Sequence, residues 1–236
     1  MLNFILKIFQ FIDGAIVYLF SNNFNLKKFL VKKFNPKTKR MTFLDVGSNL
    51  GKDISFIKGL YKENNIHAFE PNFKSFILLK KKFNNIILNN LAVDKNSDKK
   101  LMFYETLISS NSSLKKNFIN NKDYFSKITK RYYIKTISID KYCKKNKINH
   151  IDFLKIDTQG NEYEVLQSAK KYLKKNKIKL IKIEITFLNN KKKSNSNNLF
   201  KILNFISKFK YNLIGISDQK FIENKLFFFN AYFYYK

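Results

Sequence analysis

The first half of this chain alternates short apolar runs with amphipathic stretches of helical spacing, and this alternation limits the possible folds more than any other feature. The period changes from strand to helix and back over residues 41–46, 51–62, 66–70, 73–83 and 86–88. A β-α-β-α-β order predicts parallel strands joined by right-handed crossovers. We therefore expect an α/β protein with a doubly wound sheet and helices on both of its faces.

The second half of the chain continues this order after a long polar stretch. Strands are expected at 101–105, 132–139, 151–157 and 178–186, helices at 162–173 and 199–209, and a terminal antiparallel pair at 211–216 and 226–233. One domain over residues 41–236 holds all of them, and residues 1–40 form a helical extension before it. Two loops stand out, 109–126 and 189–198, and the first is the expected lid or substrate contact.

The amino terminus is apolar without being long enough to span a membrane. Lys7, Gln10 and Asp13 interrupt the apolar run, whereas a spanning helix needs about 20 consecutive apolar residues. No small-x-small cleavage site follows, which disfavours a signal peptide. The apolar residues of segment 1–20 recur near helical spacing, which predicts an amphipathic helix on the domain, on a dimer partner or on a membrane surface.

The charge of the chain is strongly positive, at +29, with 46 Lys and Arg against 17 Asp and Glu. Such a surface attracts nucleic acid, anionic lipid or acidic glycans. However, Arg40 and Arg131 are the only arginines, and the lysines are spread over the whole chain. This favours solvated lysine faces over a dedicated phosphate-binding surface, which usually also uses Arg. Cys143 is the only cysteine, which excludes an internal disulfide and suits a reducing cytoplasm.

The first candidate site is the loop with the pattern D-x-G-x-N-x-G, between the strand at 41–46 and the helix that follows. It contains Asp45, Gly47, Ser48, Asn49 and Gly51. Glycines there let the backbone pass close to a ligand. The pattern lacks the G-x-G-x-x-G of dinucleotide sites, and a carboxylate beside the loop repels pyrophosphate. It suits the ammonium of a methionine moiety, so the loop predicts S-adenosyl-L-methionine as cofactor, with a plain tight turn as the alternative.

The next candidates follow the second and third strands. Glu70, with Pro71 after it, ends the second strand about twenty residues after the loop, where a carboxylate can accept both hydrogen bonds of a ribose diol. A solvated surface acid is the alternative. After the third strand, Asn90 is expected to bond the edge of the adenine base, while Leu91 or Ala92 covers its face.

Three charged residues at the next strands are the catalytic candidates. Lys155 and Asp157 point to the same side of an apolar strand, and a charged pair there is costly without a partner. Glu184, on the following strand, faces the same rim if the strands are parallel. Asp157 is the candidate general base, with Lys155 or Glu184 setting its charge state. A divalent metal on Asp157 and Glu184 lacks a third ligand, so no metal is predicted.

Taken together, these segments resemble the FkbM family of S-adenosylmethionine-dependent methyltransferases. The resemblance rests on DVGSNLGKDIS, FEP, SSNSSL, TISID, IDFLKIDTQGNEYEVL and IKIEITF, in this order from about residue 41 to the carboxyl terminus. It implies a class I, Rossmann-like fold with a mostly parallel seven-stranded sheet and a C-terminal antiparallel hairpin. It also implies S-adenosyl-L-methionine as methyl donor and O-methylation of a hydroxyl on a sugar, glycan or secondary metabolite.

The resemblance also implies which residues lie on the reacting side of the site and which hold the cofactor. Lys155, Asp157, Gly160 and Glu162 would line the reacting side, and the glycine loop with Glu70 would hold the cofactor. Three positions depart from the family pattern. Gln159 stands where many members have Glu, Ser48 stands where Ala is common, and Asn230 stands where an acid is often found.

Two other functions stay open at this point. The basic composition suits a nucleic-acid methyltransferase acting on RNA, although the chain lacks an N/D-P-P-Y/F block. A catalytically silent protein that binds a membrane surface through residues 1–20 is the second alternative. The expected partner is a small-molecule or glycan acceptor, nucleic acid is less favoured, and the oligomeric state is open.

Overall fold

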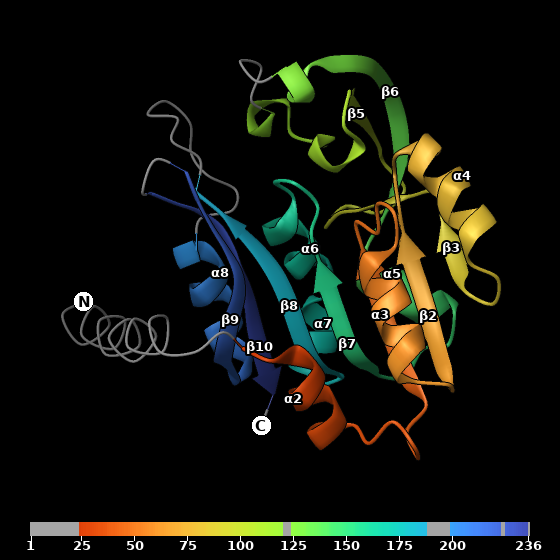
Figure 1. The fold of residues 1–236 in the computed structure, drawn as a ribbon, viewed down its shortest axis with the longest axis vertical. Helices are drawn as coiled ribbons and strands as arrows, with labels where there is room; N and C mark the ends of the chain where they lie inside the picture. The colour runs from red at the N-terminus through yellow and green to blue at the C-terminus, as the bar shows by residue number, and fades with distance from the viewer. Residues whose placement is uncertain (1–23, 120–123, 188–198, 223–224, 236) are drawn as a thin grey trace.

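The computed structural model describes residues 24–119, 124–187, 199–222 and 225–235 (Figure 1). The expected amphipathic helix over 1–20 and the loop 189–198 lie outside these residues. The helices are α2 (Leu26–Lys33), α3 (Lys52–Leu60), α4 (Phe73–Lys82), α5 (Ile139–Lys145), α6 (Glu162–Ser168), α7 (Lys170–Lys174) and α8 (Leu199–Ile206). The strands are β1 (Met41–Val46), β2 (Asn64–Phe69), β3 (Ile87–Asn89), β4 (Ala92–Val93), β5 (Lys100–Thr106), β6 (Ile128–Ile137), β7 (Ile151–Ile156), β8 (Ile178–Thr186), β9 (Tyr211–Ile222) and β10 (Lys225–Tyr235).

The main sheet has seven strands in the order β3-β2-β1-β7-β8-β10-β9. The pairs from β3 to β8 are parallel, whereas β10 runs antiparallel to both β8 and β9. This arrangement confirms the expected class I methyltransferase fold, with a mostly parallel sheet and a C-terminal antiparallel hairpin. β1 and β7 are neighbours at the centre, where the strand order reverses, and open α/β sheets bind ligands at such a point.

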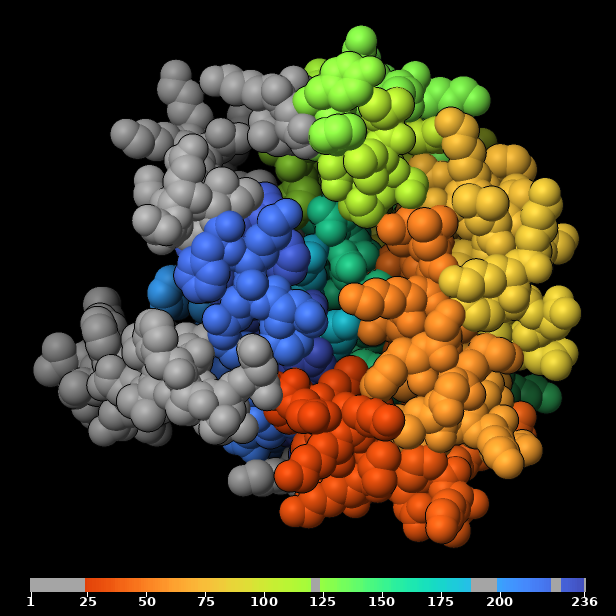
Figure 2. All heavy atoms as spheres, in the orientation of Figure 1, coloured from red at the N-terminus to blue at the C-terminus, as the bar shows by residue number. Residues whose placement is uncertain are grey.

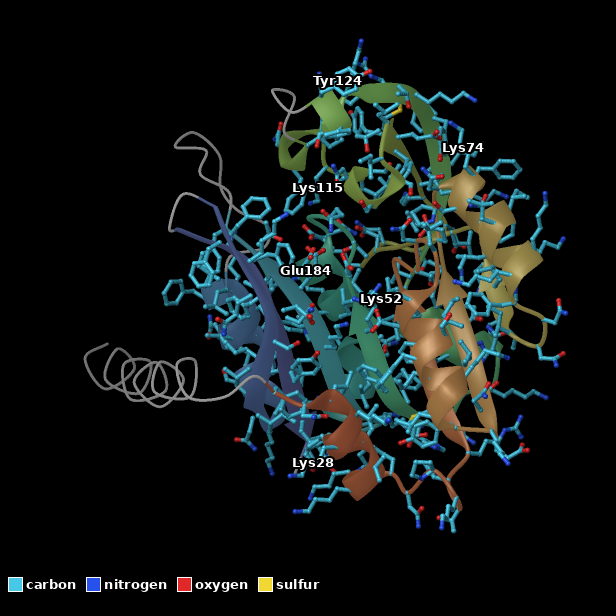
Figure 3. All side chains as sticks on the ribbon, in the orientation of Figure 1. Lys28, Lys52, Lys74, Lys115, Tyr124 and Glu184 are labelled. Carbon is cyan, nitrogen blue, oxygen red and sulfur yellow. The ribbon has the colours of Figure 1, made fainter. Side chains whose placement is uncertain are left out.

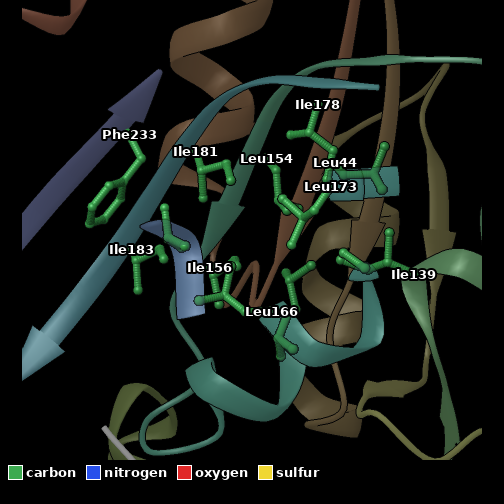
Figure 4. Close-up of a cluster of buried hydrophobic side chains, with 14 of the residues drawn as sticks. Leu44, Ile139, Leu154, Ile156, Leu166, Leu173, Ile178, Ile181, Ile183 and Phe233 are labelled. Carbon is green, nitrogen blue, oxygen red and sulfur yellow. The ribbon is translucent and has the colours of Figure 1, made fainter. Parts of the chain in front are cut away.

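Helices cover both faces of this sheet because its central strands are apolar on both sides. On β7, Leu154 and Ile156 enter one core while Phe153 enters the other. The first core is closed by α5, α6, α7 and α8 and is shown in part in Figure 4. The second is closed by α2, α3 and α4, and includes Leu30, Ile57 and Leu79.

The extension before residue 41 is in contact with the main domain over its described part. α2 begins after Asn25, whose side chain accepts a hydrogen bond from the Lys28 amide and caps the helix. Phe24 N donates to Ile216 O at 2.8 Å, and the Phe29 ring meets Tyr234 edge-on. α2 is therefore packed on the β9–β10 hairpin. The domain boundary at residue 41 stays a prediction.

A second, three-stranded sheet in the order β4-β6-β5 lies beyond the carboxyl ends of the main strands (Figure 1). The strand expected at 132–139 is β6, which begins earlier, at Ile128, because it pairs antiparallel with β5 back to Thr106. The described residues between these two strands form three short 3-10 helices, at Ser109–Asn111, Lys116–Phe118 and Tyr124–Ser126. The expected open loop is therefore a folded cap over the sheet edge.

The helix expected over 162–173 is two helices, α6 and α7, which meet at Ala169. The cause lies elsewhere in the chain. The Asp140 carboxylate of α5 accepts hydrogen bonds from the amides of Lys171 and Tyr172, at 2.9 and 3.1 Å. Asp140 thus caps a new helix start and ties α5 to α7. Among the described residues, no helix is both long and apolar enough to cross a membrane.

Candidate functional site

A pocket opens at the carboxyl ends of β1, β2 and β7, beneath the cap formed by the residues between β5 and β6. The sheet edge supplies Val46, Gly47, Asn49, Phe69, Glu70, Pro71, Leu91, Ala92, Val93, Asp157, Thr158, Gln159 and Asn161, and the cap region supplies Phe103, Ser109, Ser110, Ser112 and Leu114. Half of the sequence-predicted site residues therefore meet in one place: Gly47, Asn49, Glu70, Pro71, Ala92 and Asp157. Ser48, Gly51, Asn90, Asp45, Lys155 and Glu184 do not line the pocket and lie behind or beside it.

The loop after β1 passes between β2 and β7 with almost no free space. Gly47 has a φ of +79°, and a Cβ built there would lie 1.8 Å from the Asp157 carbonyl oxygen. The amides of Gly47 and Ser48 both donate to Phe69 O, at 3.0 and 3.1 Å. Ser48 Oγ donates back to Asp45 O at 3.0 Å. Gly47 is thus required by the close approach of the two strand ends, which brings the cofactor side and the reacting side together.

The end of the same loop fixes α3 and the cap. Gly51, with a φ of +74°, precedes α3, and a Cβ there would lie 2.4 Å from the Phe83 ring. It serves helix packing, since it does not line the pocket. Asn49 does line the pocket, and its Oδ1 accepts a hydrogen bond from Ser109 Oγ of the cap at 2.9 Å.

Glu70 is buried at the pocket wall with both carboxylate oxygens oriented by backbone amides. Oε2 accepts from Asn49 N at 2.6 Å, and Oε1 accepts from Asn72 N at 2.7 Å. Burial raises the pKa of Glu70 to about 7, although these two hydrogen bonds lower it. Each oxygen keeps a second lone pair, so the carboxylate is placed to accept further hydrogen bonds from a ligand.

One wall of the pocket is apolar. It is formed by Phe69, Leu91, Ala92, Val93 and Phe103. Asn90 is turned away from this wall, since its side-chain amide donates to Glu70 O at 2.9 Å and to Pro71 O at 3.2 Å. Its expected contact with a base edge stays a prediction, and the observed role is to hold the chain around Pro71.

The charged pair expected within the central strands has its partner. Asp45 on β1 is in register with Lys155 on β7, and Lys155 Nζ lies 3.1 Å from Asp45 Oδ1 and 3.7 Å from Asp157 Oδ2. The same ammonium donates to Gly47 O. Burial alone would lower the pKa of Lys155, but the carboxylates of Asp45 and Asp157 hold it above its ordinary range. Lys155 therefore stays charged and joins both strand ends to the glycine loop.

A second polar group forms where β7 and β8 end. Gln159 Nε2 donates to Asp157 Oδ1 at 3.0 Å and to Glu184 Oε2 at 2.8 Å, so one amide bridges two carboxylates. Gln159 has a φ of +53°, in the left-handed region. Burial, together with the neighbouring carboxylates of Asp157 and Glu162, holds the pKa of Glu184 well above its usual range. Glu184 thus keeps its proton to higher pH than an ordinary glutamic acid.

Glu162 supports this loop from below. Its Oε1 accepts from Thr158 N at 2.8 Å and from Gly160 N at 3.2 Å, and the residue is fully buried at the start of α6. The resemblance implied that Glu162 lines the reacting side. In the structure Glu162 orders the backbone of residues 158–160, while Asp157, Thr158 and Gln159 line the pocket.

Next to the pocket, the sheet face between α3 and the β9–β10 hairpin is hollowed, as Figure 2 shows. Glu184 lies in this hollow in Figure 3. On the same face, Lys182 Nζ contacts Asp53 Oδ1 of α3 at 2.9 Å. Asn230 stands opposite Glu184 on β10, and its amide donates to Asp218 Oδ2 at 2.8 Å. A row of polar and charged side chains thus leads from Asp157 to the hairpin.

Several pocket residues were absent from the sequence prediction. Gln159 and Thr158 lie inside the predicted motif, but nothing in their type indicated a bridging amide. The cap residues Ser109, Ser110 and Ser112 belong to the predicted lid segment, and the run S-S-N-S-S was the available signal. Among the described residues, no group of three or more His, Cys, Asp or Glu is arranged to hold a metal ion.

Comparison with known proteins agrees with this geometry. A family model described as "Methyltransferase FkbM domain" matches residues 45–213. No curated protein matches the chain in sequence.

Among solved structures, one from Listeria monocytogenes, described as an S-adenosylmethionine-dependent methyltransferase, superposes with a TM-score of 0.50 at 6% identity over 89% of this chain and 98% of that one. An rRNA methylase from Streptococcus thermophilus gives a TM-score of 0.47 at 11% identity over 89% and 93% of the two chains. A precorrin-6y C5,15-methyltransferase from Geobacter metallireducens gives 0.47 at 11% identity over 89% and 85%. At 6% identity, the likeness to the Listeria protein concerns the fold alone.

Proposed function

Since the chain belongs to the FkbM family of methyltransferases, we propose that it transfers the methyl group of S-adenosyl-L-methionine to a hydroxyl of a sugar, glycan or secondary metabolite. The observation that carries the proposal is a pocket lined by a buried hydrogen-bond acceptor, Glu70, by a set of apolar side chains and by the carboxylate of Asp157. Glu70 suits the ribose of an adenosyl cofactor, the apolar side chains suit its adenine ring, and Asp157 is the proton acceptor beside them.

The residues present fit this cofactor. The Glu70 carboxylate, held by two amides, is placed to accept the hydrogen bonds of a ribose diol. The apolar wall with Leu91 and Ala92 suits the face of an adenine ring. Gly47 and Asn49, which line the pocket after β1, would hold the methionine side. When bound, the cofactor supplies an electrophilic methyl group on a sulfonium.

On the reacting side, Asp157 is the proposed general base. An acceptor hydroxyl must lose its proton as it attacks, and a carboxylate within hydrogen-bond reach can take it. Gln159 and Lys155 fix the position of Asp157. Because Lys155 stays protonated, it acts as a positioning residue and not as a base.

The hollow beside the pocket supports a hydroxyl-bearing acceptor. It carries the carboxyl groups of Glu184 and Asp218 with the Asn230 amide beside them, and Lys182 on the same face is paired with Asp53. Hydroxyl groups donate to carboxylates, whereas an anionic acceptor would be repelled by them. This favours a neutral polyhydroxy compound such as a sugar.

The first test is calorimetric titration of the folded protein with S-adenosyl-L-methionine. We expect binding by the wild type, and a loss of at least tenfold in Glu70→Ala and in Gly47→Val. Glu63→Ala is the matched control, because Glu63 is an exposed acid just before β2, the strand that Glu70 follows. Failure of the folded wild type to bind would refute the proposal and favour a catalytically silent protein.

The second test addresses the acceptor. Methyl transfer from labelled donor is measured over a panel of sugars, glycans and, as a separate arm, RNA. With a competent acceptor, Asp157→Asn should lower kcat by at least ~100-fold while cofactor affinity changes less than threefold. Methylation of RNA but of no hydroxyl compound in the panel would replace the proposed acceptor class.

A further inference from the structure

A second cavity lies on the opposite side of the main sheet, between α5 and α7, and shares no lining residue with the methyl-transfer pocket. In Figure 1 both helices are behind the sheet. The cavity has a volume of about 800 Å³. Seven of its sixteen lining residues are lysines: Lys95, Lys141, Lys144, Lys147, Lys171, Lys175 and Lys177. We refer to it as the lysine groove.

Lysine is common on the whole surface, so its arrangement in the groove matters more than its number. Its share of the groove lining, seven of sixteen residues, is close to its share of the exposed described residues. Unlike the exposed lysines of α2 and α4, which project from convex helices, these line a shared hollow. Ammonium groups gathered on a concave surface reinforce one another's potential.

The groove holds little acidic charge to balance these lysines. Among the described residues that line it, Asp140 is the only acid. Its carboxylate is directed at the amides of Lys171 and Tyr172, where it caps α7. Lys141 pairs with Asp98, and Lys177 lies over the Tyr172 ring at 5.3 Å. The other five lysines have no ion pair within the described part of the chain.

The fold itself builds the groove. The hydrogen bond from Lys171 N to Asp140 holds the start of α7 against α5. Lys171 therefore lines the groove from α7 and Lys144 lines it from α5. The chain leaves α5 through Lys147, with a φ of +53°, and this turn adds a third cation. The floor carries small polar groups, including Ser138 and Ser168. The hollow is therefore a cationic channel with hydroxyl groups at its base.

We infer that the lysine groove binds the phosphodiester backbone of a single-stranded nucleic acid, without reading its sequence. Lysine binds phosphate oxygens as a point charge, and lysines on both sides of one hollow can contact successive phosphates of a strand that lies in it. Among the described residues that line the groove, none is Arg and Tyr172, under Lys177, is the only aromatic one, so base recognition is not expected. A flat bilayer surface could not reach lysines on both banks of a hollow.

The test measures fluorescence anisotropy of a labelled 20-nucleotide oligo-U RNA with the full chain, over a range of salt concentrations. The groove variant carries Lys→Gln at Lys144, Lys147, Lys171 and Lys175. The control variant carries Lys→Gln at Lys27, Lys28, Lys32 and Lys80, which are exposed lysines of α2 and α4 outside the groove. Both variants have the same net charge, so only the position of the substituted lysines differs.

We expect the groove variant to bind at least tenfold more weakly near 0.1 M salt, because fewer phosphates are neutralised. The log-log slope of affinity against salt should become shallower by about 0.7 for each phosphate that the variant no longer neutralises. The control variant should stay within threefold of the wild type. Equal weakening of both variants, or no binding by the wild type, would overturn the inference. Groove-dependent binding to phosphatidylglycerol vesicles but not to RNA would overturn it in favour of a lipid surface.

Circular dichroism and thermal melting establish that each variant folds. If the fourfold variant does not fold, the pairs Lys144/Lys147 and Lys171/Lys175 are substituted separately, with two control lysines each. Binding of S-adenosyl-L-methionine should be unchanged in the groove variant, because the two cavities share no residue. The outcome is therefore independent of the proposed methyltransferase activity.

Discussion

Substitution of Gly47 by Ala should move the end of β7 away from the loop after β1, and so move the reacting side of the site away from the cofactor side. A Cβ at this position would lie 1.8 Å from the Asp157 carbonyl oxygen and 2.8 Å from its carbon. Real Cβ atoms essentially never approach within 3.0 Å, so the β7 end must retreat by more than 1 Å. Both atoms of the clash belong to the backbone, so no side-chain rotation relieves it.

The cost can be worked from these distances. A non-glycine residue in the left-handed region costs about 1–2 kcal/mol. The retreat also strains the hydrogen bond from Asp157 N to Val46 O, 3.0 Å long, and the bond from Lys155 Nζ to Gly47 O, at about 1 kcal/mol each. The free energy of unfolding should fall by about 3 kcal/mol, and at about 2–4 °C per kcal/mol the Tm should drop by about 6–12 °C.

Gly59→Ala is the matched control. Gly59 lies inside α3, has no other atom within 4 Å of a Cβ, and does not have a left-handed φ. Alanine there should stabilise the chain by about 0.5–1 kcal/mol. Thermal melting and calorimetry with S-adenosyl-L-methionine are run on both variants. If Gly47→Ala melts within 2 °C of the wild type and binds cofactor as tightly as Gly59→Ala, the close-approach argument is wrong.

Three further predictions concern buried ionisable groups. Lys155→Met should lower the free energy of unfolding in urea by about 3–5 kcal/mol, because Asp45 is left buried and unpaired, and adding Asp45→Asn should restore part of it. Burial lowers the pKa of His67 from 6.5 to about 4. Between these two pH values the unfolded chain therefore binds more protons than the folded protein. Stability should be complete above pH 6.5 and fall by up to about 3 kcal/mol toward pH 4, and titration of His67→Gln should show no such loss. Burial raises the pKa of Glu70 to about 7, and a ribose diol favours the ionised carboxylate, so cofactor affinity should rise with pH through 7 and then level off; a pH-independent affinity in Glu70→Gln is the check.

Much of the main sheet was predictable, because its strands are buried on both faces and its helices are amphipathic. The strand at 41–46 has the predicted limits, and the hairpin follows from two apolar runs at the end of the chain. β6 was misplaced because its first residues, Thr129 to Arg131, are exposed and polar and pair only with β5. The break at Ala169 depends on a carboxylate from another helix, which local periodicity cannot show.

The position of the site was predictable, whereas the direction of its side chains was not. The carboxyl ends of parallel strands lie at the same edge of the sheet, so Gly47, Glu70 and Asp157 were expected to lie close together. Asp45 instead points into the sheet toward Lys155, and its expected contact with a methionine ammonium stays a prediction. Gln159 was missed because its bridging role depends on a left-handed backbone that the sequence does not indicate.

The placement of the acids indicates more about function here than the total charge does. The chain has only 17 acidic residues against 46 Lys and Arg, yet Asp45, Asp53, Glu70, Asp157, Glu162 and Glu184 all lie at or beside the pocket and its adjoining hollow. Burying carboxylates is costly unless they are paired or used, so this concentration is not a consequence of composition. Of these, Glu70 and Asp157 line the pocket itself, where they would favour a cation such as a sulfonium, whereas the proposed lysine groove would favour anions. One chain thus presents two surfaces of opposite preference, and substitutions at either surface should leave ligand binding at the other unchanged.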